Sequence, residues 1–257
     1  MIENTFKYVR KNLRNNKRAI VSNIKNNHFD PWNFAGEPDI CPFCGSNSSL
    51  TKEHVLPQWT FQSDPERYFE TKINDSTQYF IKTVIPVCTE CNNETLSQIE
   101  KHISLLFRKT DLSTDYFEYE ESLNIIRWLE IIEYKFHILE FRRKFIRNHS
   151  GEFIPFLKDV PMSVMRQNIN LSPSKALSQL RKAQARIIRN NKEPRYYSMV
   201  IYRSKNTQPL FFHTMDEHIY FEFPEYQMAM FYFFNKEFNS NYDAESEAKR
   251  IILKNYG

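Results

Sequence analysis

The chain has 257 residues, of which 41 % are hydrophobic and 15 % aromatic, enough for one large domain or two modest ones. Its N-terminus lacks the apolar stretch of a signal peptide, and its longest apolar run, Met228–Phe234, has only the length of a strand. With only 4 glycines, it has no glycine-rich loop of the nucleotide-binding kinds. We therefore expect a soluble, cytoplasmic protein with no membrane partner.

The formal net charge of +4 is unevenly distributed along the chain. Before residue 29 a single acid, Glu3, stands among seven basic residues: Lys7, Arg10, Lys11, Arg14, Lys17, Arg18 and Lys25. A second basic stretch runs from Lys175 to Arg195. Such stretches can bind a polyanion such as nucleic acid, or they can be solvated helix faces, and charge alone leaves both interpretations open.

The first half of the chain is predicted to combine helices with short strands. Residues 4–27 have the pattern of one polar helix or two short ones, and Asp30-Pro31 marks a turn after them. Strands are predicted around Lys52–Leu56 and at Tyr79–Val84, where β-branched and aromatic residues gather. After Cys91, apolar residues recur every three or four positions, which predicts a helix through Leu96, Ile99, Ile103 and Leu106.

The second half is predicted to be two helices, a sheet and a final helix. The first helix is strongly apolar and runs from Glu120 to about Arg147, and the second lies within residues 162–190 with Ser172 or Ser174 as its N-cap. Four short aromatic and β-branched runs then predict an antiparallel meander: "RYYSMVIYR", "PLFFHT", "HIYFEF" and "YQMAMFYFF". Asp243–Lys254 is predicted to be a helix, so the fold class is α+β.

All 4 cysteines belong to two C-x-x-C pairs, Cys41 with Cys44 and Cys88 with Cys91. Four thiolates suit a tetrahedral zinc ion, and the two-residue gap lets both sulfurs of one turn reach it. A redox C-x-x-C would explain only one pair, and disulfides are uncommon in a reducing compartment. The spacing therefore favours a structural zinc site over a redox motif or four buried free cysteines.

Polar residues with catalytic potential lie between and after these pairs. Glu53 and His54 follow the first pair, and Asn92 and Asn93 directly follow Cys91. If zinc draws the pairs together, these side chains come close to one another. Carboxylate and amide oxygens suit Mg²⁺ or Mn²⁺, and a histidine can take a proton from water. These parts suffice for metal-assisted hydrolysis of a phosphodiester.

The segments "CPFCG", "TKEHVLPQW" and "IPVCTECNNE", in this order, resemble the HNH endonucleases, which are zinc-stapled ββα-metal (His-Me finger) nucleases. The resemblance covers about residues 39–109. It implies that Glu53 and Asn92 bind a catalytic Mg²⁺ or Mn²⁺ and that His54 is the general base. It also implies that Asn93 orients the start of the helix or shares the role of Asn92.

Two features depart from that family pattern or constrain it. Many members place an Asn shortly before the second cysteine pair to orient the loop that bears the base. Here Thr83 stands nearest that position, and Asn74 is a poorly placed substitute. Neighbouring residues on a regular strand point to opposite faces, so Glu53 and His54 can serve one site only if the backbone bends there. Pro57 and the polar loop after it make such a bend plausible.

Together these observations predict three regions: a basic helical N-terminal arm (residues 1–38), a ββα-metal nuclease domain with the zinc site (39–110) and an α+β domain for recognition, assembly or regulation (111–257). The expected activity is metal-dependent cleavage of DNA, with RNA as an alternative substrate, in restriction or anti-phage defence. The expected protein partner is a second copy of the chain or a protein of the same defence system. Phosphate contacts are assigned to Lys52, Arg108, Lys109, Arg10, Lys11, Arg14, Lys17 and Arg18.

Two alternatives stay open at this stage. The chain could be a zinc-stabilised nucleic-acid-binding module without catalysis, which would have no need of Glu53, His54 and Asn92. It could also be a nuclease subunit that is active only when a partner engages its C-terminal half.

Overall fold

The computed structural model describes residues 2–28, 36–61, 68–71, 76–109, 117–144, 173–189, 196–205, 210–214, 217–236 and 238–255. The chain forms two compact units whose segments alternate along the sequence. Unit 1 comprises Met1–Val55, Thr83–Glu100 and Glu130–Arg189, and unit 2 comprises Leu56–Lys82, Lys101–Leu129 and Asn190–Gly257. Unit 1 therefore draws on all three regions predicted from the sequence.

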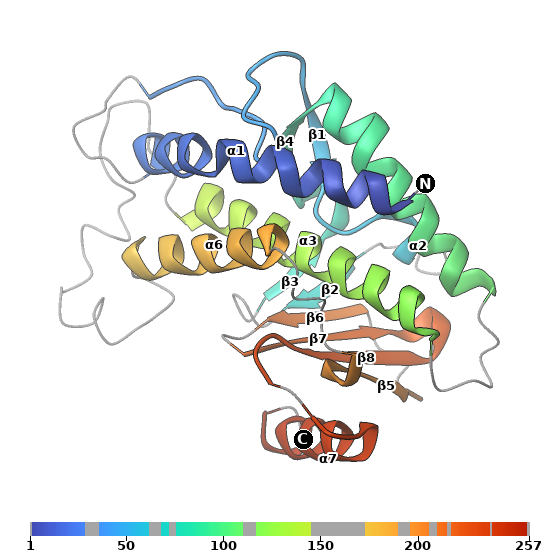
Figure 1. The fold of residues 1–257 in the computed structure, drawn as a ribbon. Coiled ribbons are helices and arrows are strands. Elements are labelled where there is room, and N and C mark those ends of the chain that lie inside the picture. Colours follow the sequence, from blue (N-terminus) through green and yellow to red (C-terminus); the bar gives the residue numbers. More distant parts are fainter. Residues whose placement is uncertain are drawn as a thin grey trace, which may run out of the picture. The chain divides into compact units, whose positions relative to one another are not determined.

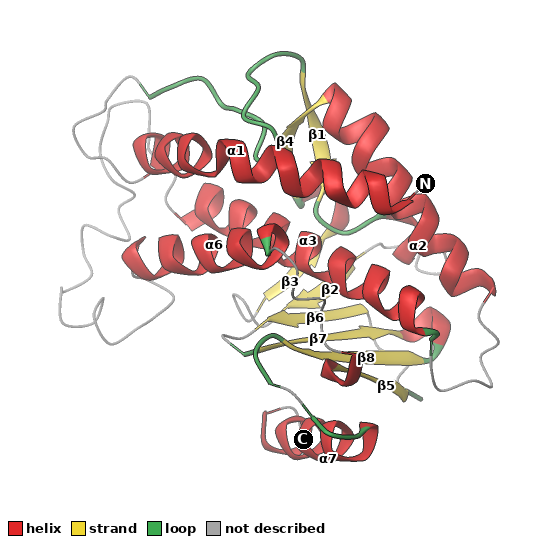
Figure 2. Cartoon of the chain, viewed as in Figure 1, coloured by secondary structure: helices red, strands yellow, loops and turns green. Residues whose placement is uncertain are grey.

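The elements are labelled in Figure 1 and coloured by type in Figure 2. The described helices are α1 (Ile2–His28), α2 (Ser97–Lys109), α3 (Tyr119–Lys144), α6 (Pro173–Ile188) and α7 (Asn241–Asn255). The described strands are β1 (Leu50–His54), β2 (Tyr68–Thr71), β3 (Ser76–Tyr79), β4 (Val84–Cys88), β5 (Met199–Arg203), β6 (Leu210–Thr214), β7 (His218–Phe223) and β8 (Met228–Phe233). Short 3-10 turns are η1 (Gln58–Phe61), η2 (Phe80–Lys82), η5 (Tyr196–Ser198) and η6 (Pro224–Tyr226), and η3 (Glu90–Leu96) is a π-helix.

Unit 1 is built around a two-stranded antiparallel sheet of β1 and β4 together with helices α1 and α6. We call this strand pair the hairpin, although residues 55–83 separate its strands in sequence. The register of the hairpin is continuous from Leu50 opposite Cys88 to His54 opposite Val84. Helix α1 packs against α6 and buries its apolar residues at helical spacing: Phe6, Val9, Leu13, Ile20 and Ile24. The polar helix predicted at the N-terminus is therefore one continuous amphipathic helix.

Unit 2 contains a six-stranded sheet in the order β3-β2-β6-β7-β8-β5. Helix α7 covers one face through Ala244, Ala248 and Ile251. Aromatic rings cover the other face, where Trp128 stacks on Trp59 with a centroid distance of 5.6 Å and lies 5.9 Å from Phe221. The aromatic residues on this face of the sheet thus form core rather than an exposed platform for nucleic-acid bases.

The structure confirms most of the predicted elements and corrects two of them. The α+β class, the C-terminal helix and the β6-β7-β8 meander are confirmed. The strand predicted at Tyr79–Val84 is wrong, since that segment is the end of β3 followed by η2, and the next strand begins at Val84. The prediction of one antiparallel meander of four strands is also incomplete. The first of these strands, β5, pairs with β8 rather than with β6, and β2 from the first half of the chain joins the sheet parallel to β6. Residues 145–147 and 162–172 of the predicted helices lie outside the described residues.

No helix in the described ranges combines the length and the apolarity that crossing a membrane requires.

Candidate metal and catalytic site

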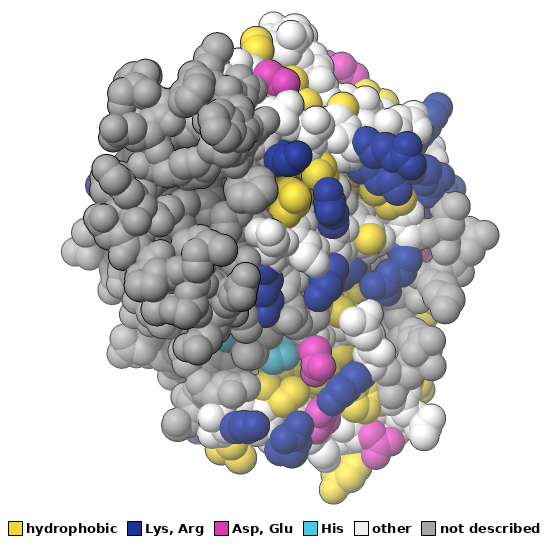
Figure 3. All heavy atoms as spheres, turned by 90° about the vertical axis from the view of Figure 1, so that its left-hand side faces the viewer, with side chains coloured by type: hydrophobic (Ala, Val, Ile, Leu, Met, Phe, Trp, Pro, Cys, Tyr) yellow, Lys and Arg dark blue, Asp and Glu magenta, His cyan; other side chains and the backbone are white. Residues whose placement is uncertain are grey.

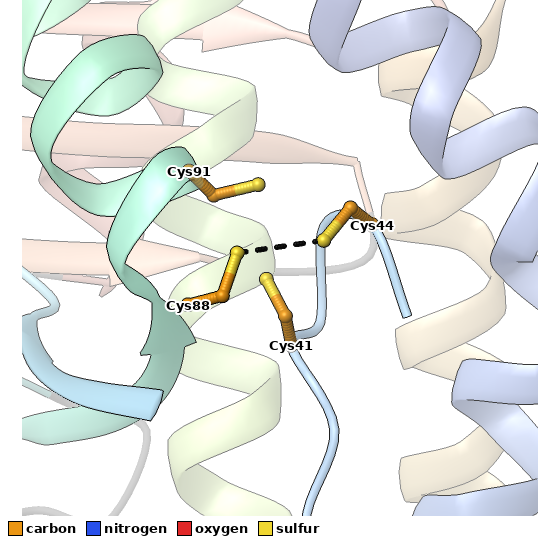
Figure 4. Close-up of side chains that lie close together, drawn as sticks. All are labelled: Cys41, Cys44, Cys88 and Cys91. Atoms are coloured by element: carbon orange, nitrogen blue, oxygen red, sulfur yellow. Dashed lines mark hydrogen bonds between the residues drawn. The ribbon is translucent and has the colours of Figure 1, made fainter. Parts of the chain in front are cut away.

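The four cysteines of the two C-x-x-C pairs converge in unit 1. Cys41 and Cys44 lie in the loop before β1, Cys88 ends β4, and Cys91 lies in η3 (Figure 4). Their four sulfur atoms all lie within 4.8 Å of one another, and all four residues are free cysteines. The Cys44 and Cys88 sulfurs are 3.5 Å apart, far longer than a disulfide of about 2 Å. Sulfurs around one tetrahedral zinc ion, each about 2.3 Å from it, would lie roughly 3.8 Å apart. The donor set and its spacing therefore fit a zinc ion.

The crowded thiols perturb one another electrostatically. Hydrogen bonds from Cys41 and Cys91 lower the pKa of the Cys44 thiol, whereas hydrogen bonding and burial raise the pKa of Cys91. Four thiolates at these distances repel one another strongly unless a cation lies between them. A divalent metal would allow all four to be deprotonated together.

The loop that presents Cys41 and Cys44 is held by backbone and side-chain contacts. The Gly45 N–H donates to the Cys41 carbonyl at 2.8 Å, and Gly45 has a positive φ of 77° that favours glycine. A β-carbon at Gly45 would meet side-chain atoms of Asn16 in α1 at 3.2 Å. From α3, the Tyr134 hydroxyl donates to the Pro42 carbonyl at 2.7 Å. The cysteine loop is thus fixed between two helices of unit 1.

Glu53 lies in a buried ion cluster rather than facing solvent. Its carboxylate accepts a hydrogen bond from the Lys135 ammonium of α3. The same ammonium donates to Glu100 of α2 at 3.1 Å and to the His54 carbonyl at 3.2 Å. Only 1 % of the Lys135 side chain and 9 % of the Glu53 side chain are exposed. Three oxygen atoms therefore use all three N–H donors of one buried lysine.

The buried cluster shifts the pKa of the two residues beside Glu53, Lys135 and Glu100. Burial alone would lower the pKa of Lys135, but the charges of Glu53 and Glu100 hold it above its ordinary value. Burial raises the pKa of Glu100, Lys135 opposes that shift, and the nearby Glu53 charge adds to it. The cluster thus has one cation shared by two carboxylates.

Asn92 contacts the hairpin through Thr51. The Thr51 hydroxyl donates its one proton to the Val87 carbonyl at 2.9 Å, because a carbonyl can only accept. The Asn92 amide nitrogen lies 2.9 Å from the same hydroxyl oxygen, which therefore accepts from it. This chain of donors fixes the orientation of the Asn92 amide, with its carbonyl oxygen Oδ1 turned away from Thr51. An amide oxygen is the atom that a hard metal ion would bind.

The backbone does not bend between Glu53 and His54, so these two side chains leave β1 on opposite faces. The register of β1 is regular through His54, so Thr51 and Glu53 share one face of the hairpin and Lys52 and His54 share the other. The chain bends only at the next two residues, and there the Val55 N–H donates to the Thr83 carbonyl at 2.9 Å. Thr83, which stands where the family pattern has an Asn, thus holds the backbone beside His54 through its main chain. Asn74 lies outside the described residues.

Asn92 and Asn93 lie in the π-helix η3, which precedes α2. The wider turn is closed by the Ser97 N–H, which donates to the Asn92 carbonyl, and by the Ser97 hydroxyl, which donates to the Asn93 carbonyl. The Asn93 side chain is exposed, whereas Asn92 is half-buried against the hairpin. Short π-helical turns are uncommon and occur frequently at functional sites.

The basic residues predicted to contact phosphate are not all in one place. Lys52 is exposed on β1, and the five residues of α1 belong to unit 1 with it: Arg10, Lys11, Arg14, Lys17 and Arg18. Arg108 and Lys109 end α2 in unit 2, where Arg108 hydrogen-bonds the Tyr226 hydroxyl. The structure thus groups six of the eight predicted contacts in unit 1.

Sequence reasoning missed the contributions of Thr51, Lys135 and a second buried network on α3. In that network the Glu133 carboxylate accepts hydrogen bonds from Arg186 of α6, including one of 2.9 Å from its Nε. His137 lies 3.3 Å from Glu133 and 3.8 Å from Glu140, and these carboxylates raise its pKa to about 9 although burial opposes the shift. The sequence feature that could have revealed these networks is the presence of charged residues inside the apolar helix α3, because buried charges need partners.

No family model matches this chain, and no curated protein or solved structure shows a significant match to it.

Proposed function

We propose that the chain is a metal-dependent endonuclease of the HNH type that hydrolyses phosphodiester bonds of DNA. One observation supports this above the others. The four cysteines meet where a two-stranded hairpin is followed by a helix, and that hairpin and helix bear Glu53-His54 and Asn92. A hairpin, a helix and a metal staple are the parts of a ββα-metal nuclease.

In this proposal the zinc site is structural. Cys41, Cys44, Cys88 and Cys91 would hold the ion and so fix the first residues of η3 against the loop before β1. The hydrogen bond from Asn92 to Thr51 depends on that attachment, because Asn92 directly follows the last cysteine. Loss of the zinc would therefore disturb the candidate catalytic residues without any of them being changed.

Glu53 and Asn92 would be the protein ligands of the catalytic ion, with water and phosphate oxygens as the others. When bound, Mg²⁺ or Mn²⁺ supplies a Lewis acid for the scissile phosphate and the leaving oxygen. Glu53 and Thr51 share one face of β1, and Asn92 contacts Thr51, so both proposed ligands belong to that face. Thr51 sets the amide of Asn92 with Oδ1 available, and Lys135 fixes the buried carboxylate of Glu53 through a hydrogen bond.

His54 would take the proton from the attacking water, and for this its imidazole has to reach the scissile phosphate around the end of β1, where the chain bends at Val55 and Leu56. His54 is the last residue of β1. Its carbonyl accepts a hydrogen bond from the Lys135 ammonium, and the N–H of the next residue, Val55, donates to the Thr83 carbonyl. These two contacts restrain the backbone on which the imidazole is mounted. General-base catalysis of this kind typically contributes 10²–10⁴-fold to a rate.

Plasmid cleavage tests the proposal. Zinc-loaded protein would be incubated with supercoiled plasmid and Mg²⁺ or Mn²⁺, comparing wild type with His54→Ala and with His102→Ala. His102 is a half-buried histidine of unit 2 with no assigned role, so it is the matched control. Wild type and His102→Ala should nick the plasmid, and His54→Ala should be slower by at least about a hundredfold. Wild type that binds plasmid and nicks it with neither metal would disprove the catalytic assignment.

One observation favours a second candidate, a zinc-stabilised nucleic-acid-binding module without catalysis. The Glu53 carboxylate already has a buried cation, Lys135, as its partner. A carboxylate neutralised in this way has less need of a metal ion and can be purely structural. Binding of DNA without cleavage by wild type would select this candidate.

A further inference from the structure

Helices α1 and α6 concentrate the positive charge of the protein. Helix α1 has seven Lys and Arg residues against one acid, and α6 has four against none, so the pair has a formal charge of +10. The whole chain has a formal charge of +4, so everything outside these two helices sums to −6. The net charge of the chain is therefore small only because the strongly basic pair of helices is offset by an excess of acidic residues elsewhere. These helices pack against each other within unit 1, although they are far apart in sequence (Figure 1).

The cations of α1 lie along one side of the helix. Lys7, Lys11, Arg14, Arg18 and Lys25 follow one another at spacings of three, four or seven residues, and Arg10 and Lys17 flank them. At about 100° per residue, all seven fall within an arc of roughly 120°. We call these seven residues the basic stripe. From Lys7 to Lys25 it extends about 27 Å, close to one turn of B-DNA at roughly 34 Å.

Four of the seven cations in the basic stripe have no ion-pair partner among the described residues. Lys11, Lys17, Arg18 and Lys25 are exposed and form no ion pair with any residue that the structure describes. Lys7 and Arg10 share Glu3, and the Arg14 guanidinium donates to the Ile188 carbonyl at the C-terminal end of α6. Figure 3 shows Lys and Arg side chains recurring over the described part of one face of the molecule.

The buried apolar side of α1 decides which polyanion fits. A helix that lies in a membrane surface must insert an exposed apolar side into the lipid. The apolar side of α1, which includes Phe6, Leu13 and Ile20, is buried in unit 1, so the surface that stays accessible is mainly charged and polar. A rigid, polar and elongated positive surface matches a phosphate backbone instead.

Contacts also attach α1 to the candidate catalytic residues. The Tyr8 hydroxyl donates to Glu90 at the start of η3, and the Thr5 hydroxyl lies 3.2 Å from the Gln98 amide oxygen at the start of α2. Asn16 lies against Gly45 of the cysteine loop. The basic stripe is therefore on a helix fixed to both ends of the segment that bears Asn92.

We propose that the basic stripe, together with the exposed Arg181 and Lys182 of α6, is the surface that binds the phosphate backbone of duplex DNA. The choice of DNA rests on the proposed function, but the binding itself requires neither the catalytic metal nor His54. Phosphate contacts of this kind position a duplex without reading its sequence.

Binding measurements on a cleavage-deficient background test this surface. A fluorescein-labelled 20-base-pair duplex would be titrated with zinc-loaded His54→Ala protein at several salt concentrations, without chelator or added Mg²⁺. The test variant adds Lys11→Gln, Lys17→Gln and Lys25→Gln. The matched control instead adds Lys205→Gln, Lys249→Gln and Lys254→Gln, three exposed lysines of unit 2. Circular dichroism melts would establish that both triple variants fold.

The test variant should bind at least about tenfold more weakly at 0.1 M salt, and its slope of log affinity against log salt should fall by about 2 to 3. The control should stay within about twofold of the parent. Equal losses in both variants, or tighter binding to duplex RNA, phosphatidylserine vesicles or polyglutamate than to DNA, would overturn the proposal. Loss of binding in the test variant alone supports it even if wild type never cleaves, so this inference and the endonuclease assignment can fail separately.

Discussion

Replacing Lys135 by Met should destabilise the protein strongly. Met has nearly the length of Lys but no charge, so the change removes three hydrogen bonds and leaves two carboxylates without their cation. Glu53 is almost fully buried, whereas 23 % of the Glu100 side chain is exposed and can be hydrated. Removing one partner of a buried ion pair typically costs about 3–5 kcal/mol of unfolding free energy. Since Glu100 can recover some hydration, we expect the main cost to come from Glu53.

The assay is urea or thermal unfolding at constant zinc, followed by circular dichroism. For a chain of this size the cost corresponds to a decrease in Tm of about 10 °C. The double variant Lys135→Met with Glu53→Gln should recover much of the loss, because the buried charge is then absent. A loss under about 1 kcal/mol for Lys135→Met at pH 7 would refute the claim that this cluster is buried and coupled.

The pH dependence of the same variant gives an independent check. Without Lys135, burial still raises the pKa of Glu100 but no cation opposes the shift, so the penalty is greatest at neutral pH and shrinks as pH falls and this carboxylate is protonated. In wild type, the raised pKa of Lys135 means that its contribution is complete below its ordinary pKa of 10.5 and is lost as pH rises through the raised value. A penalty that is the same at pH 7 and at pH 4.5 would contradict this account.

Three further predictions follow from the cysteine loop, the Asn92 contact and the α3 network. Metal analysis should find one zinc per chain, and Cys88→Ser should lose it and unfold at a lower Tm. Thr51→Val should reduce cleavage about tenfold or more by freeing the Asn92 amide and should cost roughly 1 kcal/mol of stability, whereas Thr51→Ser should retain both. Because the pKa of His137 is raised to about 9, wild type should lose up to about 3 kcal/mol of unfolding free energy as pH rises from 6.5 through 9, and His137→Leu should lack that slope.

Each of these has an outcome that would count against it. Protein that folds with full stability and no bound metal would make the cysteine cluster a packing feature rather than a zinc site. Equal cleavage by Thr51→Val and Thr51→Ser would show that the hydroxyl does not set the Asn92 amide. A slope that persists in His137→Leu would assign the titration to another group.

The cysteine cluster was predictable from sequence because a C-x-x-C turn brings two sulfurs together without help from the rest of the fold. The partners of Glu53 were not. Lys135 lies 82 positions later in a helix whose residues are buried on nearly every side, so no periodicity marks which side of α3 faces β1. The orientation of Asn92 likewise depends on Thr51, a residue that has no distinguishing pattern of its own.

The sheet of unit 2 shows a similar limit. The aromatic strands β6, β7 and β8 were predicted because their composition and turns are local signals. Strands β2 and β3 have only four residues each, with "YFET" and "STQY" as their sequences, and they join the sheet through a parallel pairing across about 140 positions. Long-range parallel pairing leaves no local trace, so sequence alone could not place them.

The alternation of the two units along the chain has a consequence for how the protein can be built and dissected. The chain passes between the units five times, and two of these passages fall within the continuous helices α2 and α3. No contiguous fragment contains all of unit 1 without segments of unit 2, and a truncated "nuclease domain" of residues 39–110 would lack both Lys135 and α6. During synthesis, both cysteine pairs emerge before the lysine that neutralises Glu53, and a nascent chain can bind zinc before its hairpin has that partner. Metal binding would then be an early event of folding, with helix α3 completing unit 1 only afterwards.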